Sequence, residues 1–249
     1  MSSIKAIKKS NNVAVESLLA STPEFLASFE SALGSHFTTA SPSALESQYE
    51  ATVTVSPDAI NTPLVAALSA YKDLLAKSIE SIQLLERFVM INIPKMEDGN
   101  NFGVTVQMTV AKALKDAREN LLKKMETLLS YYNDRAAAVE KLALEKKSIS
   151  KSSGSSTSES TSSKEDANEK KESTSSSTEE KSVATEDKAY PFRIMHLVAL
   201  DVNAYVAAKA GLNDCFNEVI MVLDNVEKNK EKITSPKGSN GGSGHMGMY

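Results

Sequence analysis

The sequence contains little of what several classes of protein require. A single cysteine, Cys215, excludes an internal disulfide framework and a zinc site built from several cysteines. The 28 basic and 32 acidic side chains give a net charge of −4, without the basic excess of nucleic-acid binders. No apolar run approaches the ~20 residues of a membrane helix, and residues 1–5 lack a signal peptide's apolar stretch. We expect a soluble intracellular protein without nucleic-acid or membrane partners. The lack of a long basic cluster favours a cytoplasmic location, and the nucleus stays open.

Sequence motifs of catalysis are missing as well. The chain contains no G-x-x-x-x-G-K-[ST], G-x-S-x-G, H-E-x-x-H or C-x-x-C pattern. Its three histidines lie far apart and show no ligand spacing: His36, His196 and His245. Cys215 lies in an apolar helical pattern without a histidine near it, so we predict a small buried hydrophobe there. The chain is therefore expected not to be an enzyme and to need no metal and no cofactor.

The placement of glycine and proline predicts long helices. Five of the ten glycines lie in the last twelve residues, whereas residues 64–93 and 104–147 contain neither glycine nor proline. Stretches of that length rich in Ala, Leu, Lys and Glu are typical of helices. We predict helices over 64–93, 104–147 and 191–233. Gly211 lies within the last of them, where we expect close helix packing.

Apolar residues recur in these helices at alternating steps of four and three. In the first helix these residues form an apolar seam: Leu64, Leu68, Tyr71, Leu75, Ile82, Leu85 and Val89. Ser78 lies in the same register. Thr62 and Pro63 are expected to start this helix, and Pro94 to end it. The second helix carries a stripe that also contains Arg118 and Arg135, with Leu114, Leu121, Met125, Leu128, Tyr132, Val139 and Leu142.

The N-terminal third has a weaker pattern. Residues 12–37 are mostly helical in pattern, and Pro23 either kinks that helix or starts a new one. Residues 41–58 include an alternating run at 51–55 that resembles a strand, but no partner strand is evident. We therefore expect an extended connection there. The predicted fold class is all-α, an antiparallel four-helix bundle with three long helices.

A polar insert separates the second and third long helices. Residues 151–182 include 13 serines and 4 threonines, and Ala167 is their only apolar residue. Such a segment cannot bury enough apolar surface to offset its ordering entropy, so we predict a disordered Ser/Thr-rich insert over 151–188. An inert solvated loop and a phosphorylated or partner-binding loop both remain open.

The segment between the first two long helices is more elaborate than a helix turn requires. Pro94 ends one helix, and the glycines and asparagines tolerate positive φ. The segment also carries an aromatic side chain and two acids, which a simple turn does not need. It is either a structured turn or a loop that contacts a partner. The segment consists of Pro94, Lys95, Met96, Glu97, Asp98, Gly99, Asn100, Asn101, Phe102 and Gly103.

This loop, together with Gln107, closely resembles the activation loop of the 11S (REG) proteasome activators over about twelve positions. The resemblance extends over about 64–144 and 191–249 and is only architectural for residues 1–60. It implies a ring heptamer of four-helix subunits that docks without ATP on the α subunits of the 20S proteasome. Whether the ring is homomeric or mixed stays open, as do the stimulated peptidase activities.

The resemblance also implies residue roles. The activation loop, residues 94–103, would open the entrance gate, and Asn100 matches the asparagine required for activation. The flexible tail, residues 235–249, would enter pockets between α subunits through Met246, Gly247, Met248 and the terminal carboxylate of Tyr249. Such a protein is a regulator of a peptidase and stimulates peptide hydrolysis.

Two departures from the family pattern stand out. Met96 replaces the more usual branched aliphatic residue, and the polar insert follows the third helix of the bundle rather than the first. The ring that the resemblance implies surrounds a central channel. We hypothesise that the insert influences what enters or leaves this channel at its outer mouth. Unchanged peptide hydrolysis and products after deletion of the insert would contradict this hypothesis. The alternative function is a helical-bundle scaffold or adaptor without gating activity, since heptad-like seams occur in both classes.

Overall fold

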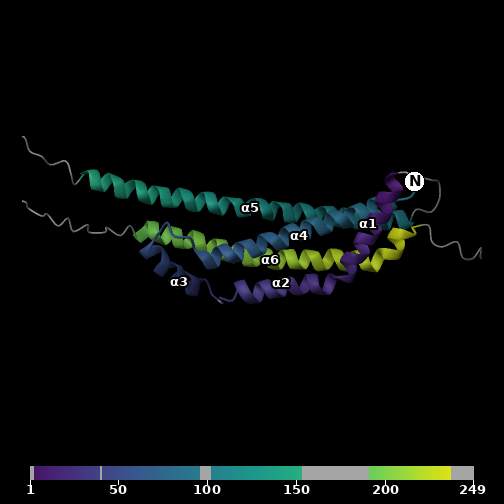
Figure 1. The fold of residues 1–249 in the computed structure, drawn as a ribbon, viewed down its shortest axis with the longest axis horizontal. Coiled ribbons are helices and arrows are strands. Elements are labelled where there is room, and N and C mark those ends of the chain that lie inside the picture. Colours follow the sequence, from purple (N-terminus) through teal and green to yellow (C-terminus); the bar gives the residue numbers. More distant parts are fainter. Residues whose placement is uncertain (1–2, 40, 96–101, 153–190, 237–249) are drawn as a thin grey trace, which may run out of the picture.

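The computed structural model describes residues 3–39, 41–95, 102–152 and 191–236. This part of the chain contains six helices and no strand, which confirms the all-α prediction. The helices are α1 (Ser3–Ala20), α2 (Thr22–His36), α3 (Pro42–Val55), α4 (Thr62–Asn92), α5 (Phe102–Ser152) and α6 (Pro191–Thr234). Figure 1 shows them as one elongated bundle.

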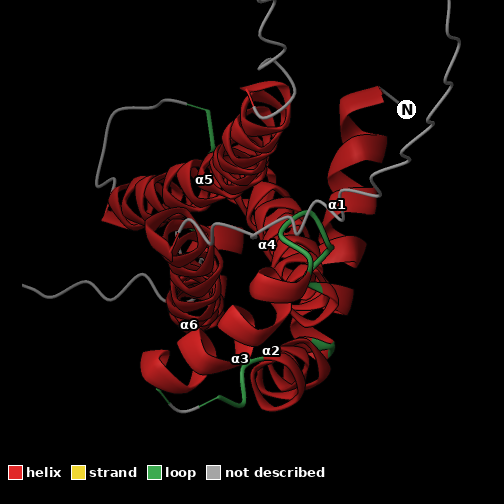
Figure 2. Ribbon diagram, turned by 90° about the vertical axis from the view of Figure 1, so that its left-hand side faces the viewer, coloured by secondary structure: helices red, strands yellow, loops and turns green. Residues whose placement is uncertain are grey.

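Three long helices form the body of the bundle. α4, α5 and α6 pack against one another, while α1 lies on α4, α2 lies on both α4 and α6, and α3 lies on α6. In Figures 1 and 2, α2 and α3 follow each other along the side of the long helices. The fourth position of the expected bundle is therefore filled by consecutive short helices rather than by one continuous helix.

Proline placement explains the break between α1 and α2. α1 ends at Ala20, and Pro23 lies in the first turn of α2. A proline is tolerated there because the first backbone N–H groups of a helix have no partner within it. Of the two alternatives for Pro23, the start of a new helix is correct.

The extended connection expected over 41–58 is wrong, because residues 42–55 form α3. The Ser41 side chain accepts a hydrogen bond from Ala44 N at 3.3 Å and so caps the helix. Three residues at steps of four, Leu45, Tyr49 and Val53, are buried. Val55 is 86% exposed. Helical burial of one face against α6 therefore outweighs the strand preference of β-branched residues.

The expected seam of α4 is buried along its whole length. Every member is at most 3% exposed: Leu64, Leu68, Tyr71, Leu75, Ser78, Ile82, Leu85 and Val89. The cap lies one residue earlier than expected, since Asn61 rather than Thr62 accepts from Leu64 N at 3.3 Å. At the other end Ile93 is extended, with ψ of 125°, which is the geometry that Pro94 favours.

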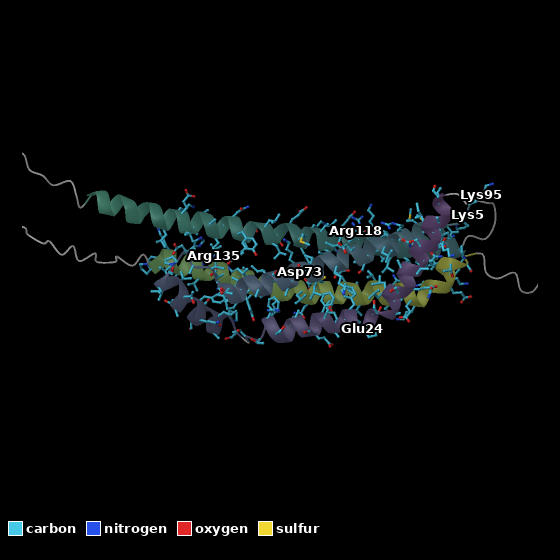
Figure 3. All side chains as sticks on the ribbon, in the orientation of Figure 1. Lys5, Glu24, Asp73, Lys95, Arg118 and Arg135 are labelled. Atoms are coloured by element: carbon cyan, nitrogen blue, oxygen red, sulfur yellow. The ribbon has the colours of Figure 1, made fainter. Side chains whose placement is uncertain are left out.

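The stripe of α5 is only partly buried. Leu114, Leu121 and Leu142 are at most 3% exposed, whereas Tyr132 is 47% exposed and its neighbour Tyr131 is the one that turns inward. This corrects the register expected for Tyr132. Arg118, the polar member near the middle, pairs with Glu86 of α4 across 2.8 Å. The arginines of the stripe thus hold neighbouring helices by ion pairs, and Figure 3 places Arg118 and Arg135 along α5.

A buried polar cluster joins α5 and α6 to the connection before α4. The carboxylate of Asp201 is fully buried and accepts from Arg135 Nε and Tyr131 Oη, each at 2.9 Å. Arg135 also donates to the Ala59 carbonyl at 3.1 Å, and Asn61 Nδ2 lies 3.5 Å from Asp201. Burial, and then the Asp201 charge, raise the pKa of Tyr131, which keeps its proton for this hydrogen bond. We call these residues the Asp201 cluster.

Gly211 lets α6 approach α4 closely, as expected from the sequence. A Cβ at this position would clash with the Tyr71 hydroxyl and lie 2.8 Å from its Cζ. Gly211→Ala is expected to lower the free energy of unfolding by about 1–2 kcal/mol, because overpacking outweighs the gain of ~1 kcal/mol in helix propensity. In a Tyr71→Phe background the cost should be smaller, as measured by urea denaturation. Equal costs in both backgrounds would contradict this contact.

Candidate functional site

Three segments that are far apart in the sequence meet at one end of the bundle. They are the end of α4, the start of α5 and the end of α6, at the right of Figure 1. The predicted activation loop joins the first two, and the predicted docking tail follows the third. The described residues reach Lys95 and Phe102 on the two sides of the loop, and Pro236 at the root of the tail.

Gln107 links all three segments. Its side chain is fully buried, and Nε2 donates to the Asn92 carbonyl at 3.0 Å and to the Ile233 carbonyl at 2.7 Å. Both carbonyls belong to the last turn of a helix, where they lack a donor from their own helix. One side-chain amide on α5 thereby caps the ends of both α4 and α6.

Gly103 brings the backbone of α5 against the root of the tail. A Cβ at position 103 would clash with the Pro236 carbonyl and lie 2.6 Å from Pro236 Cα. Only a glycine permits this approach. Gly103 was expected to shape the loop, and its described contact is with the segment after α6.

The structure describes four of the predicted loop residues. Pro94 is partly buried, Lys95 is exposed, Phe102 is 65% exposed and Gly103 is buried. In Figure 3, Lys95 lies at this end of the molecule, as does Lys5 of α1. The other predicted site residues and the predicted insert, except its start at 151–152, lie outside the described residues: Met96, Glu97, Asp98, Gly99, Asn100, Asn101, Met246, Gly247, Met248 and Tyr249.

Sequence reasoning did not assign a role to Gln107 or Asn92. Asn92 is buried and donates from Nδ2 to the Phe88 carbonyl at 2.8 Å, which strengthens the last turn of α4. Gln107 lies seven residues before Leu114 and fourteen before Leu121, on the buried stripe of α5. An uncharged polar residue in that largely apolar register was the available signal.

The described residues offer little other chemistry. Among them, no three His, Cys, Asp or Glu side chains are placed to hold a metal ion. Cys215 is buried, and its Sγ lies 3.3 Å from Ser78 Oγ. Burial raises the pKa of its thiol to about 11. Cys215 is therefore a small buried hydrophobe, as predicted. Within the same residues, no helix combines the length and apolarity needed to cross a membrane.

The fold is that of the 11S proteasome activators. PA26 from Trypanosoma brucei, solved in complex with the yeast 20S proteasome, matches with a TM-score of 0.62 over 99% of each chain at 15% identity. The 11S subunit PA28 of Plasmodium falciparum matches with a TM-score of 0.61 at 18% identity, over 94% of this chain and 92% of that one. These likenesses define the class of fold.

Sequence comparison points to the same family. Residues 58–150 match the family model of the C-terminal part of proteasome activator PA28. Proteasome activator 28 of Dictyostelium discoideum is 29% identical over 82 residues, which are 33% of this chain and 36% of that protein. Human proteasome activator complex subunit 3 is 31% identical over 83 residues, 33% of each chain. The match spans about a third of these relatives and confirms the resemblance to the 11S activators.

Proposed function

We propose that this chain is an ATP-independent activator of the 20S proteasome. In this proposal, a heptameric ring docks through its C-terminal tails on the α-subunit ring, and residues 94–103 open the entrance gate. One observation carries the proposal. The two stems of the loop, which are the end of α4 and the start of α5, meet the root of the tail, which is the end of α6 up to Pro236, at one end of the bundle. One face of the subunit can thus present both elements to the same partner. PA26, which shares the fold, was solved bound to 20S proteasomes.

The exposed surface supports self-association. Between residues 122 and 142 of α5, Leu142 is the one buried side chain, and Leu129 and Tyr132 are 64% and 47% exposed. α6 exposes Val206 and Met221 by 42% and 60%. Large apolar side chains exposed on two neighbouring helices are available for contact with another chain. A second copy of this chain is the occupant that the proposed ring supplies.

Multivalency explains how short tails suffice. Seven tails on one ring bind as linked events, so the effective concentration of each is set by its tether rather than by the bulk solution. Residues 237–249 contain five glycines, which gives a tether suited to reaching a pocket. Individually weak contacts then produce stable docking.

The test is hydrolysis of a small fluorogenic peptide by 20S proteasome without nucleotide. The chain is expected to raise the rate several-fold, and Asn100→Tyr is expected to lose most of that stimulation while still docking. A bulky ring at a loop tip prevents the loop contact but leaves the tail unchanged. Docking is measured separately, by co-sedimentation with the 20S particle.

Three outcomes of these measurements would change the interpretation. Equal loss of docking and stimulation in Asn100→Tyr would contradict the division of labour between loop and tail. If the chain forms rings and neither docks nor stimulates, the scaffold interpretation is favoured. If it stimulates only after a second subunit is added, the ring is mixed.

A further inference from the structure

We propose that Gln107 and Gly103 clamp the root of the tail to both stems of the loop, so that docked tails hold the loops in the gate-opening position. This inference rests on the proposed function. We define the root clamp as Gln107, Gly103, Asn92, Ile233 and Pro236. Gln107 and Gly103 are positioning residues in this proposal, since neither needs to touch the proteasome.

The two anchors lie on one face of α5. Positions 103 and 107 are four residues apart, so they lie one above the other on the helix. Gln107 holds Ile233 at the end of α6, and Gly103 touches Pro236 three residues later. The stretch that leaves α6 is therefore fixed at both of its ends. Residues beyond Pro236 are the first that can act as a tether.

The same amide also fixes the other stem of the loop. The Asn92 carbonyl receives the second N–H of Gln107, and Asn92 is the last residue of α4. A side-chain amide carries two N–H donors, and both are used here. Because the site is buried, water cannot replace either hydrogen bond without opening the helix ends. Movement of the tail root therefore requires movement of both stems.

The cost of this arrangement argues for a role beyond packing. Gln107 Oε1 is buried without a hydrogen-bond partner among the described residues. An unsatisfied buried acceptor destabilises the folded state, because it has lost its hydrogen bonds to water without replacement. Methionine has a similar length and would fill the same space without that cost, but it cannot donate to the two carbonyls. The glutamine is therefore best explained by its two donors.

The first test measures the clamp without the proteasome. Gln107→Met removes both donors and keeps the volume, and Gln48→Met makes the same chemical change at an exposed position on α3. Hydrogen exchange is expected to rise at least several-fold together in peptides covering 88–95, 103–110 and 228–236 of Gln107→Met. The control should show no change in these peptides. A rise confined to 103–110 would overturn the clamp.

The second test separates positioning from docking. In Gln107→Met, maximal stimulation of 20S hydrolysis is expected to fall several-fold, while the half-maximal concentration changes by less than about threefold. Gly103→Ala, which places a methyl group against the Pro236 backbone, is expected to have the same effect. It serves as the test variant if Gln107→Met proves unstable. Unchanged maximal stimulation in a variant with loosened helix ends would overturn the coupling. If the unmodified chain gives no stimulation, either alone or with a second subunit added, the proposed function fails, and the exchange experiment still decides the clamp.

A third variant, Gln107→Glu, tests the hydrogen-bond donors through a pH dependence that a loss of packing would not produce. Gln107→Glu places a carboxyl group against two carbonyl oxygens in a buried site, so its pKa is raised. The protonated form can donate one hydrogen bond and the ionised form none. Stimulation by Gln107→Glu, relative to the unmodified chain, is therefore expected to recover as the pH falls from 8 to 6. Gln107→Met should show no such recovery, and a flat ratio for Gln107→Glu would contradict the donor role.

Discussion

Removal of residues 246–249 is expected to abolish stimulation of the 20S proteasome and to leave the bundle as stable as before. Avidity from linked contacts reaches about 10²–10⁴, so loss of the docking residues from every subunit should weaken docking at least ~100-fold. The fold should not respond, because the buried core ends at Ile233, before the tail. Docking is measured by co-sedimentation, and stability by thermal unfolding.

The matched control removes four residues from the middle of the tail, 239–242. This deletion shortens the tether by the same amount and keeps the predicted docking residues. Because effective concentration depends only gradually on tether length, most of the docking should remain. If the two deletions weaken docking equally, tether length rather than the identity of residues 246–249 is what the tail provides.

Asp201→Ala is expected to lower the free energy of unfolding by about 3–5 kcal/mol. The side chain of Arg135 is only 15% exposed, and the substitution leaves its guanidinium without its carboxylate partner. It also removes the acceptor of Tyr131. An unpaired charge in the interior is far more costly than the same loss at a surface. Urea denaturation at a fixed protein concentration measures the difference.

Two comparisons make this prediction specific. Asp224→Ala removes an acid from the same helix, but its partner Lys228 is 71% exposed, so the expected cost is less than ~1 kcal/mol. The double variant Asp201→Leu with Arg135→Met replaces the buried pair by apolar groups and should recover most of the stability. A cost for Asp201→Ala no larger than that of Asp224→Ala would show that the cluster is not energetically central.

The long helices could be predicted from the sequence because their signals agree. α4 has a seam in steps of four and three, a capping residue and a proline that ends it, and each favours the same boundaries. α3 lacked such agreement. Only Leu45, Tyr49 and Val53 of its 14 residues are buried, and Val53 lies in an alternating run. Its packing on α6, more than a hundred residues away in the chain, decides the helix.

The functional end was predictable in part, and for a different reason. The loop sequence indicated the resemblance to the 11S activators directly, whereas the roles of individual loop and tail residues remain predictions. The partners of Gln107 could not be predicted, because Asn92 and Ile233 lie 15 and 126 residues away in the chain. Periodicity places Gln107 on the buried face of α5. Only the topology shows which two helix ends that face meets.

The length of α5 has a consequence for how such a chain can diverge. Its 51 residues span roughly 75 Å, from Gly103 at the clamped end to the point where the Ser/Thr-rich insert begins. A doubling of loop length costs only about 0.6 kcal/mol in closure entropy. Mutations that lengthen, shorten or rewrite the insert therefore act at the end of α5 opposite the root clamp, far from the proposed docking face. In the proposed ring, natural selection could then adjust the two faces separately, one for a fixed partner and the other for a changing cellular setting.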